Sequence, residues 1–438
     1  MNKIGIRRED KNEWERRAPL TPHHIKELKE KYGIEFVVQP SDNYIPRRIF
    51  CDDEYRKAGA EVREDLSDCD VILGVKEMPV NFFEEGKTYI FFSHTIKGQP
   101  QNMPMLKRMM ELKCNLIDYE KVTDRSGKRL IYFSYHAGLA GAIDTLWILG
   151  KRFEWKGIKT PFLKIKQTLC YKNLKDAKEN LTKVGEEIKK GLPADVVPFI
   201  VGVIGRGHVA QGVNEILECF PLEDVSPEDI KKVFVNPKED RIYRVKFLKE
   251  HTVELKEGGG FKGYDHFNKN PHLYKTCFDK YLPYLTCIFN AIYWDEGYPR
   301  LITKEMLRNL FEGSIWRLEI IGDITCDIGG SVECTVKATN PSQPTFVYHP
   351  LTEEIKDGYE GEGLVILAVD NLPCELPLES SEFFSNALYR FIPDVAKADF
   401  TKSYEEIELP FEVKNAMILC HGEFTPNYEY MRRFVEDV

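Results

Sequence analysis

Strand-like and helix-like segments alternate along the first part of the chain. Apolar runs of strand character occur at residues 2–7 and again as GIEFVVQP, DVILGVKEMP and KTYIFFSHTIK. Between them the apolar residues recur at helical spacing, as in residues 21–33, where Thr21 is the expected N-cap and Gly33 the C-terminal stop. Residues 129–150 read as a strand that runs into a helix. Such alternation predicts a parallel sheet with helices on both faces.

A second alternating unit follows a long, polar-faced helix expected over residues 172–191. The apolar run VPFIVGVIG ends in glycines, and the runs at 285–294, 318–330 and 361–373 are typical of buried strands. Residues 235–283 contain few apolar runs and much Gly, Asn and Lys, so we expect an insertion or surface excursion there. The pattern predicts two α/β domains, each with a doubly wound parallel sheet.

Composition narrows the class of protein. The 438 residues are 42% hydrophobic and 30% charged, and a net charge of -9 with interleaved Lys/Arg and Asp/Glu disfavours nucleic-acid binding. The charged start MNKIGIRRED and the lack of any stretch near eighteen apolar residues predict a cytoplasmic protein without a membrane partner. Eleven cysteines without a Cys-x-x-Cys pair indicate reduced core thiols, and no metal site is expected.

A glycine turn follows the apolar strand of the second unit. Gly205, Gly207 and Ala210 form a G-x-G-x-x-A fingerprint between a strand and a helix, with Arg206 inside it. The first glycine permits the tight turn, the second lets the backbone approach a pyrophosphate, and the small third residue lets helix and strand pack closely. This context favours dinucleotide binding over a glycine turn that only joins two elements.

The choice between NAD and NADP depends on the strand after the turn. An NAD site usually has an acidic residue at the end of that strand, and none is cleanly placed in CFPLEDVSPEDIKK. Ser226, with Arg206, Lys231 and Lys232 close in sequence, would suit a 2′-phosphate. We therefore favour NADP, while NAD stays open.

Several motifs together resemble one family. ERRAPLTP, GVKEMP, FFSHTIK, LIDYEK, FSYHAGLAG and LAVDNLPCELPLESSEFF occur in order along the chain. They resemble the lysine–ketoglutarate reductase half of aminoadipic semialdehyde synthase and, more distantly, lysine-forming saccharopine dehydrogenase, alanine dehydrogenase and transhydrogenase. The resemblance implies two Rossmann-like domains with a cleft between them: a substrate domain of residues 1–137 plus 335–438, and a nucleotide domain of residues 138–334.

The resemblance also implies catalytic residues. Lys76 and His94, each at the end of an apolar strand, correspond to the pair of proton carriers, and Glu120 corresponds to the glutamate beside the lysine. Taken singly, Lys76 would read as a solvated strand-end lysine and His94 as a core histidine. Their joint occurrence in family motifs favours catalysis.

Further positions are implied for ligands. The expected substrate-binding residues are cationic or flank the cations: Arg17, Lys97, Gln99, Arg129 and Phe133. Arginine suits this task because its planar fork matches a carboxylate. Besides the glycine turn, the expected cofactor-binding residues are Asn290 and Asp327.

The implied activity is an oxidoreductase that condenses lysine with 2-oxoglutarate and reduces the imine with NADPH to saccharopine. Two alternatives stay open: NAD-dependent cleavage of saccharopine toward lysine, and a catalytically silent dinucleotide-binding regulatory protein. The expected partners are these small molecules, and the sequence leaves formation of a homo-oligomer open.

Overall fold

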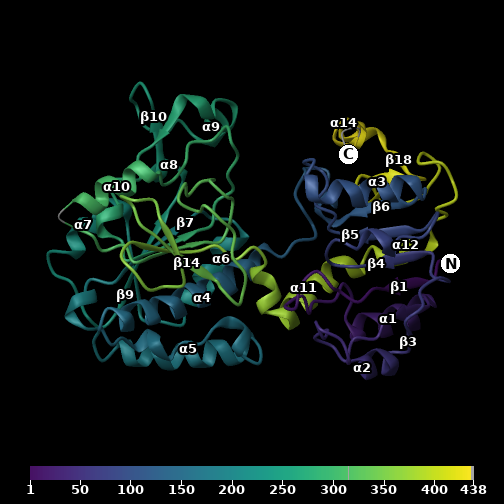
Figure 1. Cartoon of the computed structure of the whole chain (residues 1–438), viewed down its shortest axis with the longest axis horizontal. Coiled ribbons are helices and arrows are strands. Elements are labelled where there is room, and N and C mark those ends of the chain that lie inside the picture. Colours follow the sequence, from purple (N-terminus) through teal and green to yellow (C-terminus); the bar gives the residue numbers. More distant parts are fainter. Residues whose placement is uncertain (314, 436–438) are drawn as a thin grey trace. The chain divides into compact units, whose positions relative to one another are not determined.

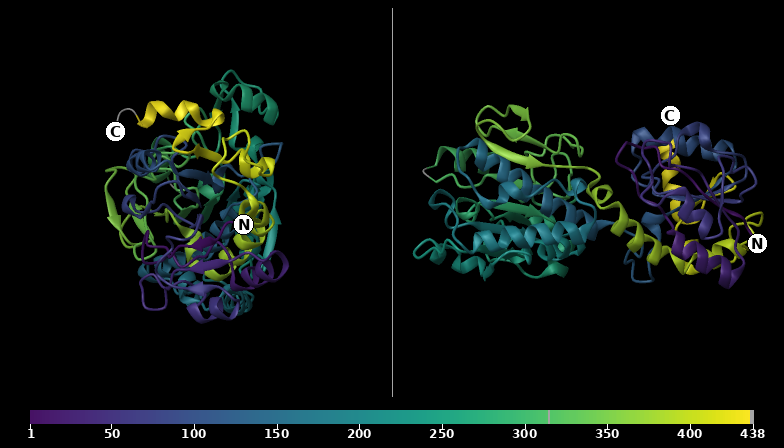
Figure 2. Two further views of the ribbon diagram at one scale, coloured as in Figure 1. Left: turned by 90° about the vertical axis from the view of Figure 1, so that its right-hand side faces the viewer. Right: turned by 90° about the horizontal axis from the view of Figure 1, so that it is seen from below.

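The chain folds into two compact units, shown in the computed structural model of Figure 1, which describes residues 1–313 and 315–435. Unit 1 combines residues 1–133 with 377–438, and unit 2 consists of residues 134–376. The C-terminal segment thus returns to the unit in which the chain begins. In Figures 1 and 2 its yellow elements lie among the purple and blue N-terminal ones.

Unit 1 contains an eight-stranded sheet in the order β18-β17-β6-β5-β4-β1-β2-β3. Strands β1 to β6 pair in parallel, while β17 is antiparallel to β6 and β18 is antiparallel to β17. The strands are β1 (Ile4–Ile6), β2 (Phe36–Val38), β3 (Glu61–Val62), β4 (Val71–Leu73), β5 (Thr88–Phe91), β6 (Asn115–Asp118), β17 (Met417–Cys420) and β18 (Glu423–Phe424). The helices are α1 (Pro22–Tyr32), α2 (Asp52–Lys57), α3 (Met103–Glu111), α11 (Pro377–Tyr389), α12 (Ile392–Lys397), α13 (Phe411–Lys414) and α14 (Arg432–Val435).

The first helix confirms the capping pattern read from the sequence. The Thr21 hydroxyl accepts a hydrogen bond from the His24 N–H, and Gly33 ends the helix with φ 71° in the left-handed region. The C-terminal segment holds this helix entry in place, because Ser381 Oγ accepts from the Ala18 N–H and Ser385 Oγ from the Thr21 N–H, each at 2.9 Å.

Unit 2 has its own eight-stranded sheet, in the order β15-β14-β16-β13-β12-β7-β9-β8. The six strands from β16 to β8 pair in parallel, and β14 and β15 complete one side in antiparallel fashion. The strands are β7 (Ile200–Ile204), β8 (Leu222–Val225), β9 (Ile242–Phe247), β12 (Cys287–Asn290), β13 (Ile320–Asp323), β14 (Thr345–Tyr348), β15 (Ile355–Asp357) and β16 (Leu364–Leu367). The helices are α4 (Ser134–Trp155), α5 (Leu174–Ile188), α6 (His208–Leu217), α7 (Ile230–Val233), α8 (Lys249–Thr252), α9 (Tyr264–Lys269) and α10 (Lys304–Glu312).

The sheet of unit 2 extends further along the chain than the sequence predicted. Residues 335–376 were expected in the first domain, yet β16 pairs with β13, and β14 pairs with β16. The main-chain hydrogen bonds of these strands therefore place the segment in unit 2, and the chain passes back to unit 1 at Pro377.

Strand β9 corrects the expectation that residues 235–283 form an excursion. It lies between β7 and β8, paired with both in parallel. Its sequence IYRVKF hides this position because two basic residues, Arg244 and Lys246, interrupt the apolar pattern. Arg244 is buried in the strand, where Asp224 of β8 accepts hydrogen bonds from its Nε at 2.6 Å and its Nη2 at 2.9 Å. The paired carboxylate makes the buried guanidinium tolerable.

The actual excursion is shorter and has a small core of its own. Strands β10 (Val253–Leu255) and β11 (Tyr274–Thr276) form a two-stranded antiparallel sheet, with α9 between them in sequence. Buried Phe267 and Tyr274 pack with the two strands, and Tyr298 packs against this cluster. This aromatic cluster lies next to the glycine turn, because Phe267 and Tyr298 line a cavity together with the residues of the turn.

Helices α4 and α6 pack against each other at glycines. A Cβ on Gly138 would overlap the Val209 carbonyl, and one on Gly212 would overlap the Tyr135 carbonyl. Helix α4 begins at Ser134, and residues 129–133 form no regular strand, so the strand expected before this helix is absent. The close approach fixes α6, the helix that follows the glycine turn, against the long helix of unit 2.

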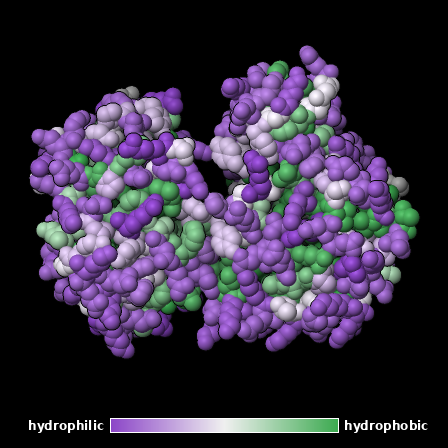
Figure 3. Space-filling view, turned by 180° about the vertical axis from the view of Figure 1, so that it is seen from behind, coloured by the Kyte–Doolittle hydropathy of each residue, from purple (hydrophilic) through white to green (hydrophobic). Residues whose placement is uncertain are grey.

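Hydrophilic side chains cover most of the face shown in Figure 3, with apolar ones gathered in smaller patches. Within residues 1–313 and 315–435, no helix combines the length and the apolar character that a membrane span requires.

Candidate functional site

The three expected catalytic residues follow neighbouring parallel strands of unit 1. Lys76 lies three residues beyond the end of β4, His94 three beyond β5, and Glu120 two beyond β6. These strands are adjacent in the sheet, as Figure 1 shows. Since the carboxyl ends of parallel strands meet at one edge, the structure brings the three residues to the same edge of the sheet.

His94 is paired with a residue that the sequence analysis did not select. Its Nδ1 lies 2.8 Å from Glu77 Oε1, and Lys11 Nζ lies 3.6 Å from the other oxygen of that carboxylate. Burial would raise the pKa of Glu77, but the hydrogen bond and charge of His94 and the charge of Lys76 outweigh it and lower the pKa to about 2. The signal was available, because Glu77 directly follows Lys76 in the GVKEMP motif.

The backbone of His94 has an unusual conformation. Its φ of 47° lies in the left-handed region, which costs a residue with a Cβ about 1 kcal/mol or more. Asn102 stabilises this turn by donating from its side-chain amide to the His94 carbonyl at 3.0 Å, and the Phe92 ring stacks on the imidazole. The fold thus holds the imidazole in one orientation toward Glu77.

A second carboxylate, Glu9, also lay outside the expected set. It follows β1, is buried, and accepts hydrogen bonds from the Val75 N–H at 2.7 Å and the Lys76 N–H at 3.0 Å. Burial raises its pKa to about 7, with Arg7 and the two backbone donors opposing the shift. Glu9 therefore fixes the main chain that carries Lys76, and it titrates near neutral pH.

Arg17 is buried in an ion pair. Its Nε and Nη2 donate to the two carboxylate oxygens of Glu15 at 2.7 and 2.5 Å. The guanidinium also lies over the Phe133 ring, 4.2 Å from its centroid, and Phe133 stacks on Phe384 of α11 at 4.7 Å. The structure thus joins two expected substrate-binding residues, Arg17 and Phe133, through a cation–π contact.

The remaining expected substrate-binding residues are closer to solvent. Lys97 is exposed, and its backbone N–H donates to the Gln99 side chain at 3.2 Å. Arg129 is also exposed and lies 3.7 Å from Glu120, so this ion pair links two residues selected from the sequence. These residues belong to the loops that follow β5 and β6.

The glycine turn lies at the carboxyl end of β7 in unit 2. Gly205 has φ 111°, and a Cβ there would lie 2.7 Å from the Ala291 carbonyl oxygen, so only glycine fits. Gly207 is the N-cap of α6, and a Cβ on it would meet no atom within 4 Å. Ala210 is buried in the first turn of α6. The turn therefore has the shape expected for a phosphate-binding loop, with open space before Gly207.

A cavity of about 310 Å³ lies at this turn, entirely within unit 2. The glycine turn and the end of β9 form part of its wall, and the aromatic residues Tyr264, Phe267 and Tyr298 of the neighbouring segments form another part. Its lining includes Arg206 and Lys249 and no acidic residue. Such a site suits an anionic ligand with an apolar or aromatic portion.

Ser226 lies elsewhere. It follows β8 at the edge of the sheet and caps a short turn by accepting from the Asp229 N–H at 3.2 Å. Strand β9 separates β8 from β7, and Ser226 is absent from the cavity lining. The strand next to β7 is β9, which ends at Phe247. In a Rossmann-type fold the ribose-binding acid follows the strand next to the glycine-turn strand, so the corresponding position here lies among the residues after β9. The sequence analysis missed this shift because it read β9 as an excursion.

The other two expected cofactor-binding residues follow β12 and β13. Asn290 is buried, and its amide donates to Asp323 and Ser331 at 2.8 Å each, which ties together the ends of two strands. Asp327 is exposed in the loop after β13. Neither residue lines the cavity at the glycine turn.

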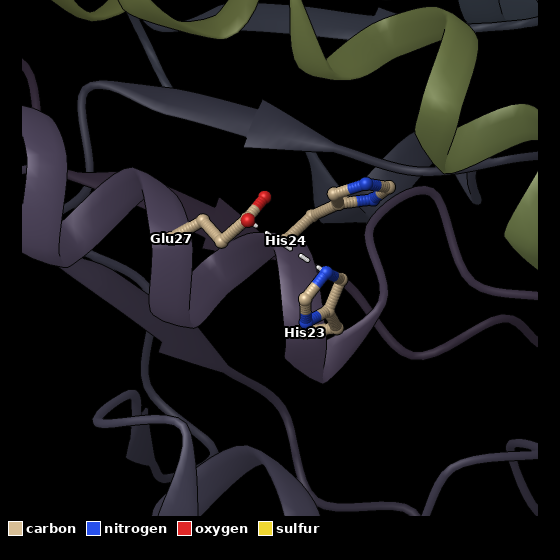
Figure 4. Close-up of side chains that lie close together, drawn as sticks. All are labelled: His23, His24 and Glu27. Atoms are coloured by element: carbon tan, nitrogen blue, oxygen red, sulfur yellow. Dashed lines mark ion pairs between the residues drawn. The ribbon is translucent and has the colours of Figure 1, made fainter.

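One group of side chains in the described residues has spacing that could hold a metal ion: His23, His24 and Glu27 on the first turns of α1. In Figure 4 the dashed line joins His23 and Glu27, whose Nε2 and Oε1 lie 3.8 Å apart. The His24 Nδ1 already contacts Ser385 Oγ at 2.6 Å. These contacts account for the three side chains as surface and capping interactions, and we assign no metal to them.

Two mostly parallel sheets, one of which ends in a glycine turn beside a cationic cavity, define a Rossmann-type dinucleotide-binding protein. Two family models match the chain: the alanine dehydrogenase/PNT N-terminal domain over residues 5–140 and the corresponding C-terminal domain over residues 295–426. The chain belongs to the alanine dehydrogenase/PNT family.

Individual relatives agree with this assignment. Alpha-aminoadipic semialdehyde synthase of Bos taurus is 35% identical over 449 residues, which cover 99% of this chain and 48% of that protein. Saccharopine dehydrogenase (NAD+, L-lysine-forming) of Emericella nidulans is 27% identical, covering 95% of this chain and 98% of that protein. A solved L-alanine dehydrogenase shares the fold with a TM-score of 0.63 at 16% identity, over 99% of both chains. The chain spans about half the length of the synthases it matches.

Proposed function

We propose that the protein condenses lysine with 2-oxoglutarate and reduces the resulting imine to saccharopine, with NADPH as the reductant. The observation that carries the proposal is the alignment of Lys76, the His94–Glu77 pair and Glu120 at the ends of three adjacent strands. The similarity to the bovine synthase over nearly the whole chain supports the choice of substrates.

The chemistry requires two proton transfers at the substrate. A base removes a proton from the lysine ε-ammonium so that the amine can attack the keto carbon, and an acid protonates the hydroxyl of the carbinolamine so that water leaves. We propose Lys76 and His94 for these steps, with Glu120 adjusting the charge beside them. Glu77 would hold the His94 ring in the orientation that the proton transfer needs.

The two substrates carry three carboxylates, and unit 1 offers cations for them. We propose Arg17, Lys97 and Arg129 as their binding residues, with Gln99 and Phe133 beside them. Arg17 already pairs with Glu15, so it contributes less net charge than Lys97. Its role would be to present a fixed guanidinium rather than a free cation.

The nucleotide would bind in unit 2, and it supplies the hydride when bound. The open space at Gly207 would admit the pyrophosphate, and the cavity beside it would admit the adenosine portion. Asn290 would act indirectly, by holding the ends of β12 and β13, and Asp327 would lie on the adjacent loop. NADPH is favoured because the cavity contains cations and no carboxylate.

The relative from Emericella nidulans favours a second candidate, NAD-dependent conversion of saccharopine to lysine, which uses the same residues. The two candidate functions differ in cofactor preference and in the direction in which the reaction proceeds.

The test is oxidation of NADPH and NADH in the presence of lysine and 2-oxoglutarate. We expect the wild type to oxidise NADPH with both substrates present, and Lys76→Met to lose activity by about 10²- to 10⁴-fold with unchanged thermal unfolding. Lys128→Met, an exposed lysine of the loop after β6, is the matched control and should stay active. The proposal fails if neither cofactor is oxidised and saccharopine with NAD or NADP is also inert, whereas full activity of Lys76→Met would refute the catalytic assignment alone.

A further inference from the structure

Among the residues that the structure describes, Lys249 is a cation without an acidic partner, and it lies at the cavity beside the glycine turn. It directly follows Leu248 at the end of β9, is partly buried, and lines the cavity together with the glycine turn. Its Nζ lies 4.6 Å from the centroid of Phe267 and 5.7 Å from that of Tyr298. Among the residues that the structure describes, no carboxylate forms an ion pair with it.

The surroundings of Lys249 favour an anion. Burial lowers the pKa of its ammonium group, because few polar contacts replace the water it has lost. The two aromatic rings offset part of this loss, and an incoming anion would offset more. A lysine held in this way at a cavity is therefore a binding position rather than a solvated surface charge.

Arg206 provides a second cation on the same cavity. It lies within the glycine turn, and its guanidinium stacks on the Tyr264 ring at 4.3 Å. Like Lys249, it has no acidic partner among the described side chains. The stacking fixes the direction of the guanidinium, so both cations are held by aromatic rings of the excursion.

The position of Lys249 in the sheet indicates which part of a dinucleotide it would meet. In Rossmann-type folds the residue after the strand next to the glycine-turn strand faces the adenosine ribose, where an acid binds the 2′-hydroxyl of NAD. Here that strand is β9, and Lys249 is the charged residue among those after it that line the cavity. Asp224 of β8 is engaged with Arg244 instead.

We propose that Lys249, assisted by Arg206, binds the 2′-phosphate of an NADP-type nucleotide and sets the preference of this protein for NADP over NAD. The inference deepens the proposed function and rests on it for the reaction, but the binding site is testable without any turnover.

The experiment compares 2′,5′-ADP with 5′-AMP, which differ only in the 2′-phosphate, by titration calorimetry on the full chain. We expect the wild type to bind 2′,5′-ADP at least about tenfold more tightly. Lys249→Met should abolish this ratio, Lys249→Arg should retain most of it, and the exposed Lys256→Met in the same excursion should leave it unchanged. Circular dichroism melting checks that each variant is folded.

Two results would overturn the inference: equal affinity of the wild type for the two nucleotides, or an unchanged ratio in folded Lys249→Met. The oxidation assay tests the proposed reaction separately from this inference about nucleotide preference. If the nucleotide ratio follows Lys249 while lysine and 2-oxoglutarate elicit no oxidation, the inference holds and the proposed reaction fails. If the wild type oxidises NADH in preference to NADPH, the reaction holds and the inference fails.

Discussion

The ends of the parallel strands in the two units differ in how their cations are neutralised. In unit 1, acidic side chains accompany the cations: Glu15 pairs with Arg17, Glu77 with His94, and Glu120 with Arg129. In unit 2, Arg206 and Lys249 line a cavity that has no acidic residue and are held by aromatic rings. The corresponding edges of the two sheets thus carry two kinds of charge arrangement.

The difference indicates two kinds of chemistry. A histidine next to a carboxylate is oriented for proton transfer, whereas an arginine next to a carboxylate stays charged and serves to bind or to orient. A cation that contacts only aromatic rings has no carboxylate to neutralise it and is available to an incoming anion, which would also offset the burial that lowers the pKa of Lys249. The comparison therefore predicts that substitutions in unit 1 change pH dependence, whereas those in the cavity of unit 2 change nucleotide affinity.

The largest effect that sharpens this comparison is expected for Glu9→Gln. The folded-state pKa of Glu9, about 7, lies above the ordinary 4.5, so its contribution to stability is fully present below pH 4.5 and is lost as pH rises through 7. Relative to the wild type, the variant should gain about 3 kcal/mol in the free energy of unfolding between pH 4.5 and 8. Urea unfolding over this range measures the gain, and exposed Glu13→Gln is the control. A difference that is constant with pH would contradict the prediction.

The next effect concerns the open space at Gly207. Gly207→Val should fold, because a Cβ at this position would meet no atom within 4 Å, yet it should weaken NADPH binding by about a hundredfold through overlap with the phosphates. Tryptophan fluorescence titration and thermal unfolding measure the two properties. Gly205→Ala should instead lower the stability, since its φ is positive and the Ala291 carbonyl is close. Wild-type affinity in Gly207→Val would place the nucleotide elsewhere.

A smaller effect is expected from Asp224→Asn. This change removes the nearer of the two carboxylates beside buried Arg244. It should cost about 1 kcal/mol of stability, since Asp224 itself is half exposed and Glu218 also lies 3.9 Å from the guanidinium. The affinity ratio of 2′,5′-ADP to 5′-AMP should not change, because Asp224 does not line the cavity. A change in that affinity ratio would indicate that β8 contributes to the nucleotide site.

The smallest effect is expected from Ser226→Ala. The hydroxyl caps a three-residue turn, so its loss should lower stability by about 0.5 kcal/mol. Nucleotide affinity should stay within about twofold of the wild type. A marked loss of NADPH binding would support the role that the sequence had suggested for Ser226.

The sequence predicted those parts of the molecule that depend on local chemistry. The caps of α1 and the glycine turn could be read directly, because each needs particular residues at fixed positions. Strand β9 could not, since Arg244 is acceptable there through partners on other elements, Asp224 of β8 and Asn214 of α6. Glu9 was missed for a related reason: its role comes from contacts across the sheet edge, which spacing along the chain does not show. Glu77 could have been selected, because it directly follows Lys76 in the GVKEMP motif.

The return of the chain to unit 1 has a consequence for synthesis. Residues 1–133 cannot complete their sheet when they leave the ribosome, because β17 adds to β6 only after residue 417, and the serines of α11 that hold the start of α1 come late as well. Unit 2, continuous from 134 to 376, has all its strands available earlier. Unit 2 is thus expected to fold first during synthesis, and the sheet of unit 1 to be completed last. A premature stop before residue 417 would leave residues 1–133 without β17 and open to proteases.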